Sequence, residues 1–232
     1  MRSKLIAACM ALAAFTAFAI VPAMASAANN PLVVENGTAV AVGTKILATN
    51  VGNTKMTTSL GTVECSKSVL TGELTKNTTG AVEGNITSAE FSGTGAQAAG
   101  EPAPECTTQA IFGGDTSITP NPATNGLPWC IRSTTAMAEH EFQVRGNSCA
   151  NAARPIRFTM NITGIGNCVY QRTTAIPGKF TTSTTDSTLS ISEVEFPKLE
   201  GGFACPSSGK LDMTFTMETD ASPSFTSLGI TS

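Results

Sequence analysis

The sequence is poor in the residues from which most catalytic and cofactor sites are built. It has one histidine, one tryptophan and one tyrosine, and charged residues make up 13% of its 232 positions. It contains no C-x-x-C pair, no glycine-rich phosphate loop and no basic run, so zinc knuckles, nucleotide sites and nucleic-acid binding are not indicated. Helical apolar periodicity is also nearly absent. What remains is a threonine-rich chain, and β-branched threonine favours strands.

The N-terminus has the order of a secretory leader. Two basic residues precede an apolar run from Leu5 to Val21, and small residues follow. We expect residues 1–27 to be a signal peptide that is removed, with Ala25-Ser26-Ala27 favoured over Ala23-Met24-Ala25 as the cleavage motif. The alternative is a retained membrane anchor. It is disfavoured because the apolar run is short for a membrane span and no basic stop-transfer flank follows it.

Removal of this leader changes the charge of the chain. It takes Arg2 and Lys4 from the 14 basic residues and leaves 12 against 17 acidic ones, a net charge of −5. Such a balance does not favour nucleic acid as a partner. Cys9 lies in a segment loosely similar to a lipoprotein box, but we expect it to be discarded with the leader. The sequence therefore predicts a secreted, extracellular protein with no membrane span after cleavage.

Six cysteines remain after cleavage, and an even number in an exported chain indicates three disulfides. The count alone leaves many pairings open. Strand-like runs on either side of Met137-Ala138 would fold back and bring the third cysteine to the fourth, and a fold-back near Asp186 would bring the fifth to the sixth. We therefore predict sequential pairing. The predicted pairs are Cys65 with Cys106, Cys130 with Cys149, and Cys168 with Cys205.

Alternation of apolar and polar residues predicts antiparallel strands with one face in a core. The clearest runs are Pro155 to Thr163 and Leu211 to Glu218, and Asn36-Gly37 predicts a hairpin with a two-residue turn. We predict an all-β fold, an antiparallel β-sandwich of Greek-key or jelly-roll type with three disulfides. Residues 28–232 are expected to form a single domain, although their length also fits two small ones. Further strands are predicted at 62–66, 68–76, 82–91, 107–112, 129–136, 139–145, 168–174 and 187–196.

Irregularities are also predicted from the pattern. The alternation slips within 82–91 and again within 187–196, which indicates a β-bulge in each strand. Gly93 to Pro104 and Gly113 to Pro128 are rich in glycine, alanine and proline, so we expect loops there.

The candidates for acid-base or nucleophilic chemistry are weak. His140 lies between Glu139 and Glu141, but in a strand it would share a face with Phe142, so packing at a core edge is the favoured interpretation. Gly146-Asn147-Ser148 loosely resembles a nucleophile elbow, yet no helix and no later histidine follow it. We therefore assign no catalytic, cofactor-binding or metal-binding residue and expect no cofactor.

Acidic residues on neighbouring predicted strands leave one enzymatic alternative open. Two of them could serve as acid and base of a glycan-active hydrolase if they converged in a cleft. They could equally lie on the solvated face of a sheet. Trp129, beside Cys130, is expected to pack in the core, although the preceding loop could expose it to sugars. The acidic residues concerned are Asp212, Glu218, Glu193 and Glu195.

Three segments carry a resemblance to other proteins: residues 121–130 (NPATNGLPWC), 142–146 (FQVRG) and 205–213 (CPSSGKLDM). Through them the chain resembles a loose group of uncharacterised exported actinobacterial β proteins. The resemblance implies export and a secreted β architecture, and it carries no catalytic residue over to this chain.

Taken together, the sequence favours a secreted, non-enzymatic binding or structural module. It would act at or outside the cell surface on an unknown protein or cell-wall partner. The alternative is the secreted hydrolase with paired carboxylates.

Overall fold

A computed structural model describes residues 29–93, 105–110, 114–120, 126–151, 154–220 and 225–231. In this part of the chain almost every element is a β-strand, and a three-residue 3-10 turn, η1 (Cys149–Asn151), is the one helical element. The predicted leader lies outside the described residues. The strands are β1 (Leu32–Glu35), β2 (Thr38–Ala39), β3 (Lys45–Asn50), β4 (Thr54–Thr58), β5 (Gly61–Cys65), β6 (Lys67–Thr78), β7 (Ala81–Ser92), β8 (Cys106–Ala110), β9 (Gly114–Pro120), β10 (Trp129–Thr134), β11 (Glu141–Gly146), β12 (Ile156–Ile162), β13 (Gly166–Arg172), β14 (Ile176–Phe180), β15 (Thr188–Glu200), β16 (Ser208–Thr219) and β17 (Gly229–Thr231).

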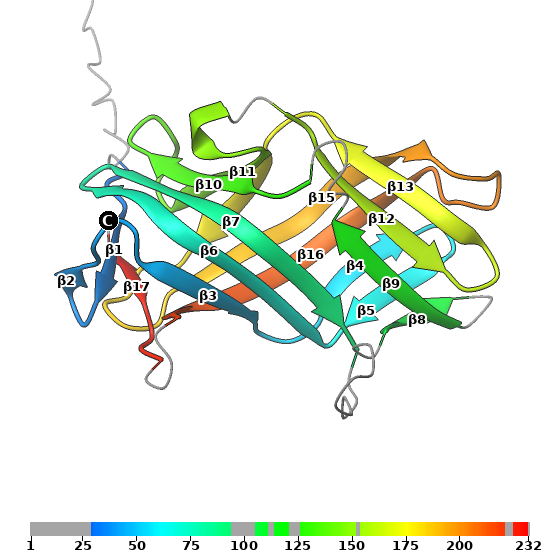
Figure 1. The fold of residues 1–232 in the computed structure, drawn as a ribbon, viewed down its shortest axis with the longest axis horizontal. Helices are drawn as coiled ribbons and strands as arrows, with labels where there is room; N and C mark the ends of the chain where they lie inside the picture. Colours follow the sequence, from blue (N-terminus) through cyan, green and yellow to red (C-terminus); the bar gives the residue numbers. More distant parts are fainter. Residues whose placement is uncertain are drawn as a thin grey trace, which may run out of the picture.

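The two ends of the described chain meet in a small antiparallel sheet. β1 lies between β2 and β17, and Figure 1 shows this sheet at one end of the elongated molecule. Asn36 and Gly37 join β1 to β2 with φ angles of 49° and 79°. Both angles are positive, as a type I′ turn requires, so the predicted hairpin is confirmed.

The other strands form one large antiparallel sheet that closes on itself. Their order is β10-β11-β14-β15-β13-β12-β9-β8-β5-β4-β16-β3-β6-β7, and β7 returns to β10. An additional pairing of β15 with β16 divides this closed sheet into two rings. The first ring consists of β10, β11, β14, β15, β16, β3, β6 and β7. The second ring consists of β15, β13, β12, β9, β8, β5, β4 and β16.

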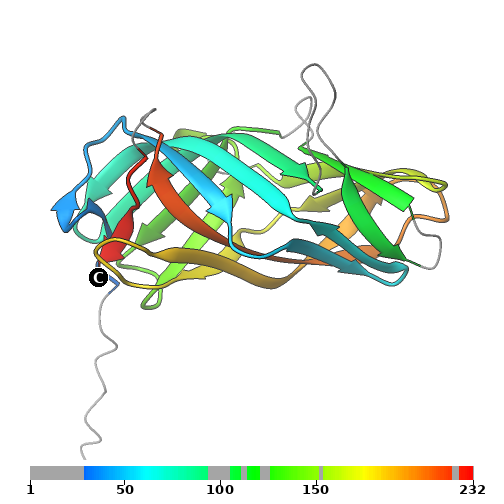
Figure 2. The ribbon, with the colours of Figure 1, turned by 90° about the horizontal axis from the view of Figure 1, so that it is seen from below.

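The closed sheet is sandwich-like, because two walls of strands face each other across a common core. Figure 2 shows these walls from the side, with the terminal sheet beside the first ring and the second ring at the far end. The predicted all-β antiparallel sandwich class with three disulfides is confirmed. Closure of the sheet also leaves fewer free edges than an open sandwich has.

β15 and β16 belong to both rings because each is long enough to change partner along one edge. β15 pairs with β14 at Leu189 and Ser190 and with β13 at Lys198 and Glu200. Between these stretches the register with β16 shifts from Ile191 to Val194, which confirms the predicted bulge in 187–196. The other predicted bulge is confirmed in β7, where Thr87 has no partner in the register with β6.

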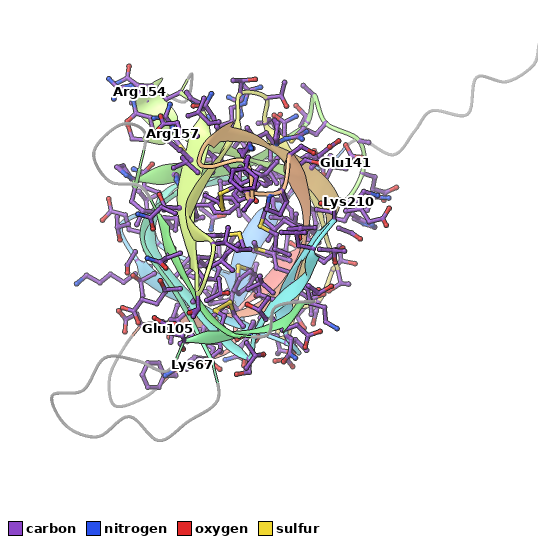
Figure 3. The ribbon with its side chains drawn as sticks, turned by 90° about the vertical axis from the view of Figure 1, so that its right-hand side faces the viewer. Lys67, Glu105, Glu141, Arg154, Arg157 and Lys210 are labelled. Atoms are coloured by element: carbon purple, nitrogen blue, oxygen red, sulfur yellow. A yellow bond between two sulfur atoms is a disulfide. The ribbon has the colours of Figure 1, made fainter. Side chains whose placement is uncertain are left out.

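The alternation of apolar and polar residues along the strands places the apolar side chains in the core, as predicted. Ile156, Phe158, Met160 and Ile162 of β12 are all buried. Between β11 and β14, Phe142 faces Gly178, and its ring occupies the place of a side chain that Gly178 lacks. Figure 3 looks along the molecule from the end of the second ring, where side chains fill the interior and the labelled charged residues lie around the outside.

The three disulfides have the predicted sequential pairing. Cys65–Cys106 joins β5 to β8, Cys130–Cys149 joins β10 to η1, and Cys168–Cys205 joins β13 to the loop before β16. Two of the bridges therefore lie in the second ring and one in the first.

β9 and β14 depart from the predictions, and β3, β4 and β17 also lie outside the predicted strands. β9 (Gly114–Pro120) lies inside the predicted loop from Gly113 to Pro128, so that expectation was wrong for these residues. β9 pairs with β8 and β12, and Thr116 is buried between them. These contacts favour a strand, although the local composition does not favour one. β14 was not predicted because Pro177 and Gly178 interrupt its alternation. The predicted loop from Gly93 to Pro104 lies almost wholly outside the described residues.

Candidate functional site

His140 does not lie on a strand, which corrects the predicted start of that strand at Glu139. It occupies the turn before β11 with a positive φ of 61°. The imidazole is half-exposed, its Nε2 is 3.5 Å from Glu139 Oε1, and its ring meets Phe180 edge to face at 5.6 Å between centroids. This places His140 at the edge of the core, in a turn at the end of the first ring.

Neither of the cavities described below brings together the four acidic residues of the hydrolase alternative. Asp212 Oδ1 accepts hydrogen bonds from Ser192 Oγ at 3.0 Å and from the backbone N–H of Glu193 at 2.8 Å, so it supports the β15 bulge. Glu193 Oε1 lies 3.9 Å from Lys210 Nζ. None of these acidic residues, nor Glu195 or Glu218, lines either interior cavity.

The other candidate motifs of the sequence do not form the geometry that their chemistry needs. Ser148 precedes Cys149, which is in a disulfide, and the chain continues into the short turn η1 rather than into a helix. The strand-to-helix geometry of a nucleophile elbow is therefore not formed. Among the described residues, no three histidine, cysteine or acidic side chains are grouped as a metal site would need.

The first interior cavity lies within the first ring. It has a volume of about 100 Å³, and its wall consists almost wholly of apolar atoms. Val33 and Ile230 of the terminal sheet and Pro31, which precedes β1, line it together with Phe142, Phe180 and Met217 from the ring strands. At ~24 cal/mol per Å³, an empty cavity of this size costs about 2 kcal/mol of stability. Well-packed cores rarely contain such voids.

The second interior cavity adjoins the first and has a volume of about 60 Å³. Leu70 of β6 and Ile86 of β7 line both cavities, so these two side chains form a shared wall. Met56 and Met213 also line the second cavity, and methionine adapts its shape more readily than branched side chains do.

Two polar atoms in residues around the second cavity are buried without a hydrogen-bond partner. They are the indole Nε1 of Trp129 and the hydroxyl Oγ1 of Thr54. Trp129 is 8% exposed and Thr54 is 2% exposed, so water reaches neither side chain freely. Burial of Trp129 agrees with the expectation that it packs in the core. A buried donor without a partner is uncommon in native proteins and calls for a physical explanation.

Among the described residues, the most exposed aromatic side chain lies in a loop at the far end of the molecule. The Phe203 loop, which we define as residues 201–205, holds Phe203 fully exposed, and Leu199 near the end of β15 is also exposed. Lys198 Nζ donates to the carbonyl oxygens of Gly202 at 3.3 Å and of Cys205 at 3.1 Å. The disulfide from Cys205 to Cys168 ties the loop to β13. The loop is therefore held in place while its apolar tip meets solvent.

The fold and these features define a class: an all-β, disulfide-linked domain with an apolar interior and one constrained apolar loop. No helix of the described residues is long and apolar enough to cross a membrane. Comparison of the chain with protein-family models, with curated proteins and with solved structures found no match.

Sequence reasoning missed both the cavities and the Phe203 loop. The cavities arise where strands from distant parts of the chain leave space between them, and residue volumes across such contacts cannot be read from one sequence. The loop had a local signal, since Gly201-Gly202 precede an isolated phenylalanine before Cys205. In a glycine-rich turn a large apolar residue has no strand face to pack against.

Proposed function

We propose that this chain is a secreted, non-enzymatic binding module that acts at or outside the cell surface by contact with a protein of the cell envelope. The observation that carries the proposal is the constrained, fully exposed ring of Phe203. Large exposed apolar groups often mark interaction sites, and a loop that is already ordered loses little entropy on binding. Three disulfides support export, because such bonds form and persist in oxidising compartments.

The glycan-active hydrolase is not our conclusion. That chemistry needs an acid and a base that face each other across the sugar. Asp212 instead holds the bulge of β15 through Ser192 and Glu193, and the interior cavities contain none of the four candidate carboxylates.

The test is the binding of labelled protein that begins at residue 28 to isolated envelopes of the source cells, with unlabelled protein as competitor. We expect saturable binding, and Phe203→Ser should weaken it at least about fivefold because the ring fills a pocket on the partner. Phe225→Ser is the matched control, since Phe225 is also exposed and is remote in sequence from the Phe203 loop. It should leave the affinity unchanged.

Protease treatment of the envelopes before binding should abolish the saturable component, because the proposed partner is a protein. Binding that survives protease, or an unchanged affinity of the Phe203→Ser variant, would contradict the proposal. A circular dichroism spectrum of each variant confirms that the β-fold is retained.

A further inference from the structure

We propose that an arginine-lined outer face, where β11 leads into β12, binds an acidic segment of a protein. The arginine face, as we define it, consists of Arg145 on β11, Arg154 in the connection to β12 and Arg157 on β12. It is a second contact surface, separate from the Phe203 loop between β15 and β16. The proposal does not depend on the contact through Phe203.

The charges of the chain are distributed unevenly around this face. Residues 142–185 contain five basic side chains and no aspartate or glutamate. The other residues of 28–232 carry seven basic and 17 acidic side chains, a net charge of −10. A surface region of one sign within a chain of the opposite sign favours partners of complementary charge. The five basic residues are Arg145, Arg154, Arg157, Arg172 and Lys179.

The strand register brings the arginines of the face together on the outside of the sheet. Buried and outward side chains alternate along β11 and β12, and Arg145 and Arg157 occupy outward positions. Gly146, which follows Arg145, forms an antiparallel bridge with Arg154, so these two arginines are neighbours. Arg154 is exposed, and the other two are half-buried. Figure 3 shows Arg154 and Arg157 together on one side of the molecule.

The contacts of these guanidinium groups hold them in place without cancelling their charge. Arg145 Nη2 donates to Gln143 Oε1 at 3.4 Å. Arg157 donates to Gln171 Oε1 from Nε at 3.0 Å and from Nη2 at 2.6 Å. Both acceptors are uncharged amides. The ion pairs found among the described residues include neither Arg145 nor Arg154.

Two other arginines of this region do not belong to the face, because each has a local role. Arg132 lies opposite Glu83 of β7 in the register of β10. Arg172 donates to the backbone carbonyl oxygens of Ala175 at 3.2 Å and Glu195 at 2.8 Å. The binding charge is therefore concentrated at the three arginines of the face.

The chemistry of the face favours carboxylates on a polypeptide. The planar guanidinium group fits a carboxylate through two parallel hydrogen bonds. The exposed large apolar side chains of the described residues all lie outside 142–185, so the face offers no aromatic platform for a sugar ring. A nucleic acid would meet the net charge of −10 on the rest of the molecule. An acidic chain segment needs only the paired charges.

Binding is measured with purified protein that begins at residue 28 and with labelled poly-L-glutamate, by fluorescence anisotropy. We expect saturable binding at about 20 mM salt and at least about tenfold weaker binding at about 0.5 M salt, because salt screens exposed charges. Polygalacturonate carries carboxylates on a sugar chain. It should bind at least about threefold more weakly per carboxylate, because its sugar rings find no stacking partner.

Variants locate the binding on the arginine face. The double variant Arg145→Gln/Arg154→Gln should bind poly-L-glutamate at least about fivefold more weakly, since two guanidinium groups are lost. Lys67→Gln/Lys210→Gln removes the same charge at exposed positions that Figure 3 shows away from Arg154 and Arg157. This control should stay within about twofold of the unmodified protein. Arg154→Gln alone changes an exposed residue and should weaken binding about two- to threefold.

Four results would overturn the proposal. The first is no saturable binding of poly-L-glutamate at low salt, and the second is tighter binding of polygalacturonate. The third is an equal loss in the arginine and lysine variants, which Arg154→Gln against Lys67→Gln still decides if the double variant fails to fold. The fourth is self-association that salt abolishes, since a second copy would then occupy the face. None of these results bears on envelope binding through Phe203.

Discussion

At the scale of single residues, the buried phenol of Tyr170 couples stability to pH. Tyr170 is fully buried on β13 and donates to the carbonyl oxygen of Pro206 at 3.3 Å. Burial raises the pKa of Tyr170 from 10.0 to about 12, because the phenolate would lose its hydration. The folded-state pKa thus lies above the unfolded one, so the unfolded chain releases this proton first as the pH rises.

We therefore predict that the Tyr170 contribution to stability is fully present below pH 10 and is lost as the pH rises to about 12. Over that window the free energy of unfolding should fall by roughly 2 to 3 kcal/mol. Because the chain has one tyrosine, tyrosinate absorbance measures this group alone. The Tyr170→Phe variant should lack this part of the pH dependence. Phenolate that appears near pH 10 in the folded protein would contradict the prediction.

At the scale of the element, the bulge of β15 depends on one carboxylate. Asp212 Oδ1 accepts from Ser192 and from the backbone of Glu193, a non-glycine residue with a positive φ of 51°. Asp212→Ala should lower the free energy of unfolding by about 1 to 2 kcal/mol, because both donors lose their acceptor. Asp212→Asn keeps a carbonyl oxygen there and should lie within about 0.5 kcal/mol of the unmodified protein.

Denaturant unfolding measures the stability of the two variants, and Asp212→Ala should be less stable than Asp212→Asn. Equal losses for Asp212→Ala and Asp212→Asn would show that the negative charge, rather than the acceptor geometry, is what the bulge needs. That result would contradict the role of Asp212 as a hydrogen-bond acceptor for the bulge and would favour a role for its charge.

The strands and turns also show how much of the fold could be predicted from the sequence. The bulges in β7 and β15 were predicted because an extra residue shifts which side chains are apolar, and a sequence displays that shift directly. β9 was not predicted, because its local composition favours a loop and one of its two pairings is with β12, which lies much further along the chain. Closure of the sheet and the interior cavities depend on distant contacts of this kind. His140 was misplaced by alternation because a turn with positive φ interrupts the strand there.

At the scale of the whole molecule, the two rings share their central hairpin. β15 and β16 contribute to both rings, so unfolding of one ring removes strand partners from the other. The rings should therefore unfold in a single transition. The chain supplies one probe for each ring, since Trp129 lies on β10 of the first and Tyr170 on β13 of the second.

Disulfide removal tests this coupling. Replacement of Cys65 and Cys106 by alanine should cost about 2 to 4 kcal/mol, mainly because the unfolded chain becomes less restricted. Replacement of Cys130 and Cys149 should cost less, by under about 1 kcal/mol, because its loop spans 19 residues rather than 41. Although Cys65–Cys106 lies in the second ring, its loss should shift the Trp129 and Tyr170 unfolding midpoints by the same amount. A shift of the Tyr170 midpoint alone would mean that the rings unfold independently and that the shared hairpin does not couple them.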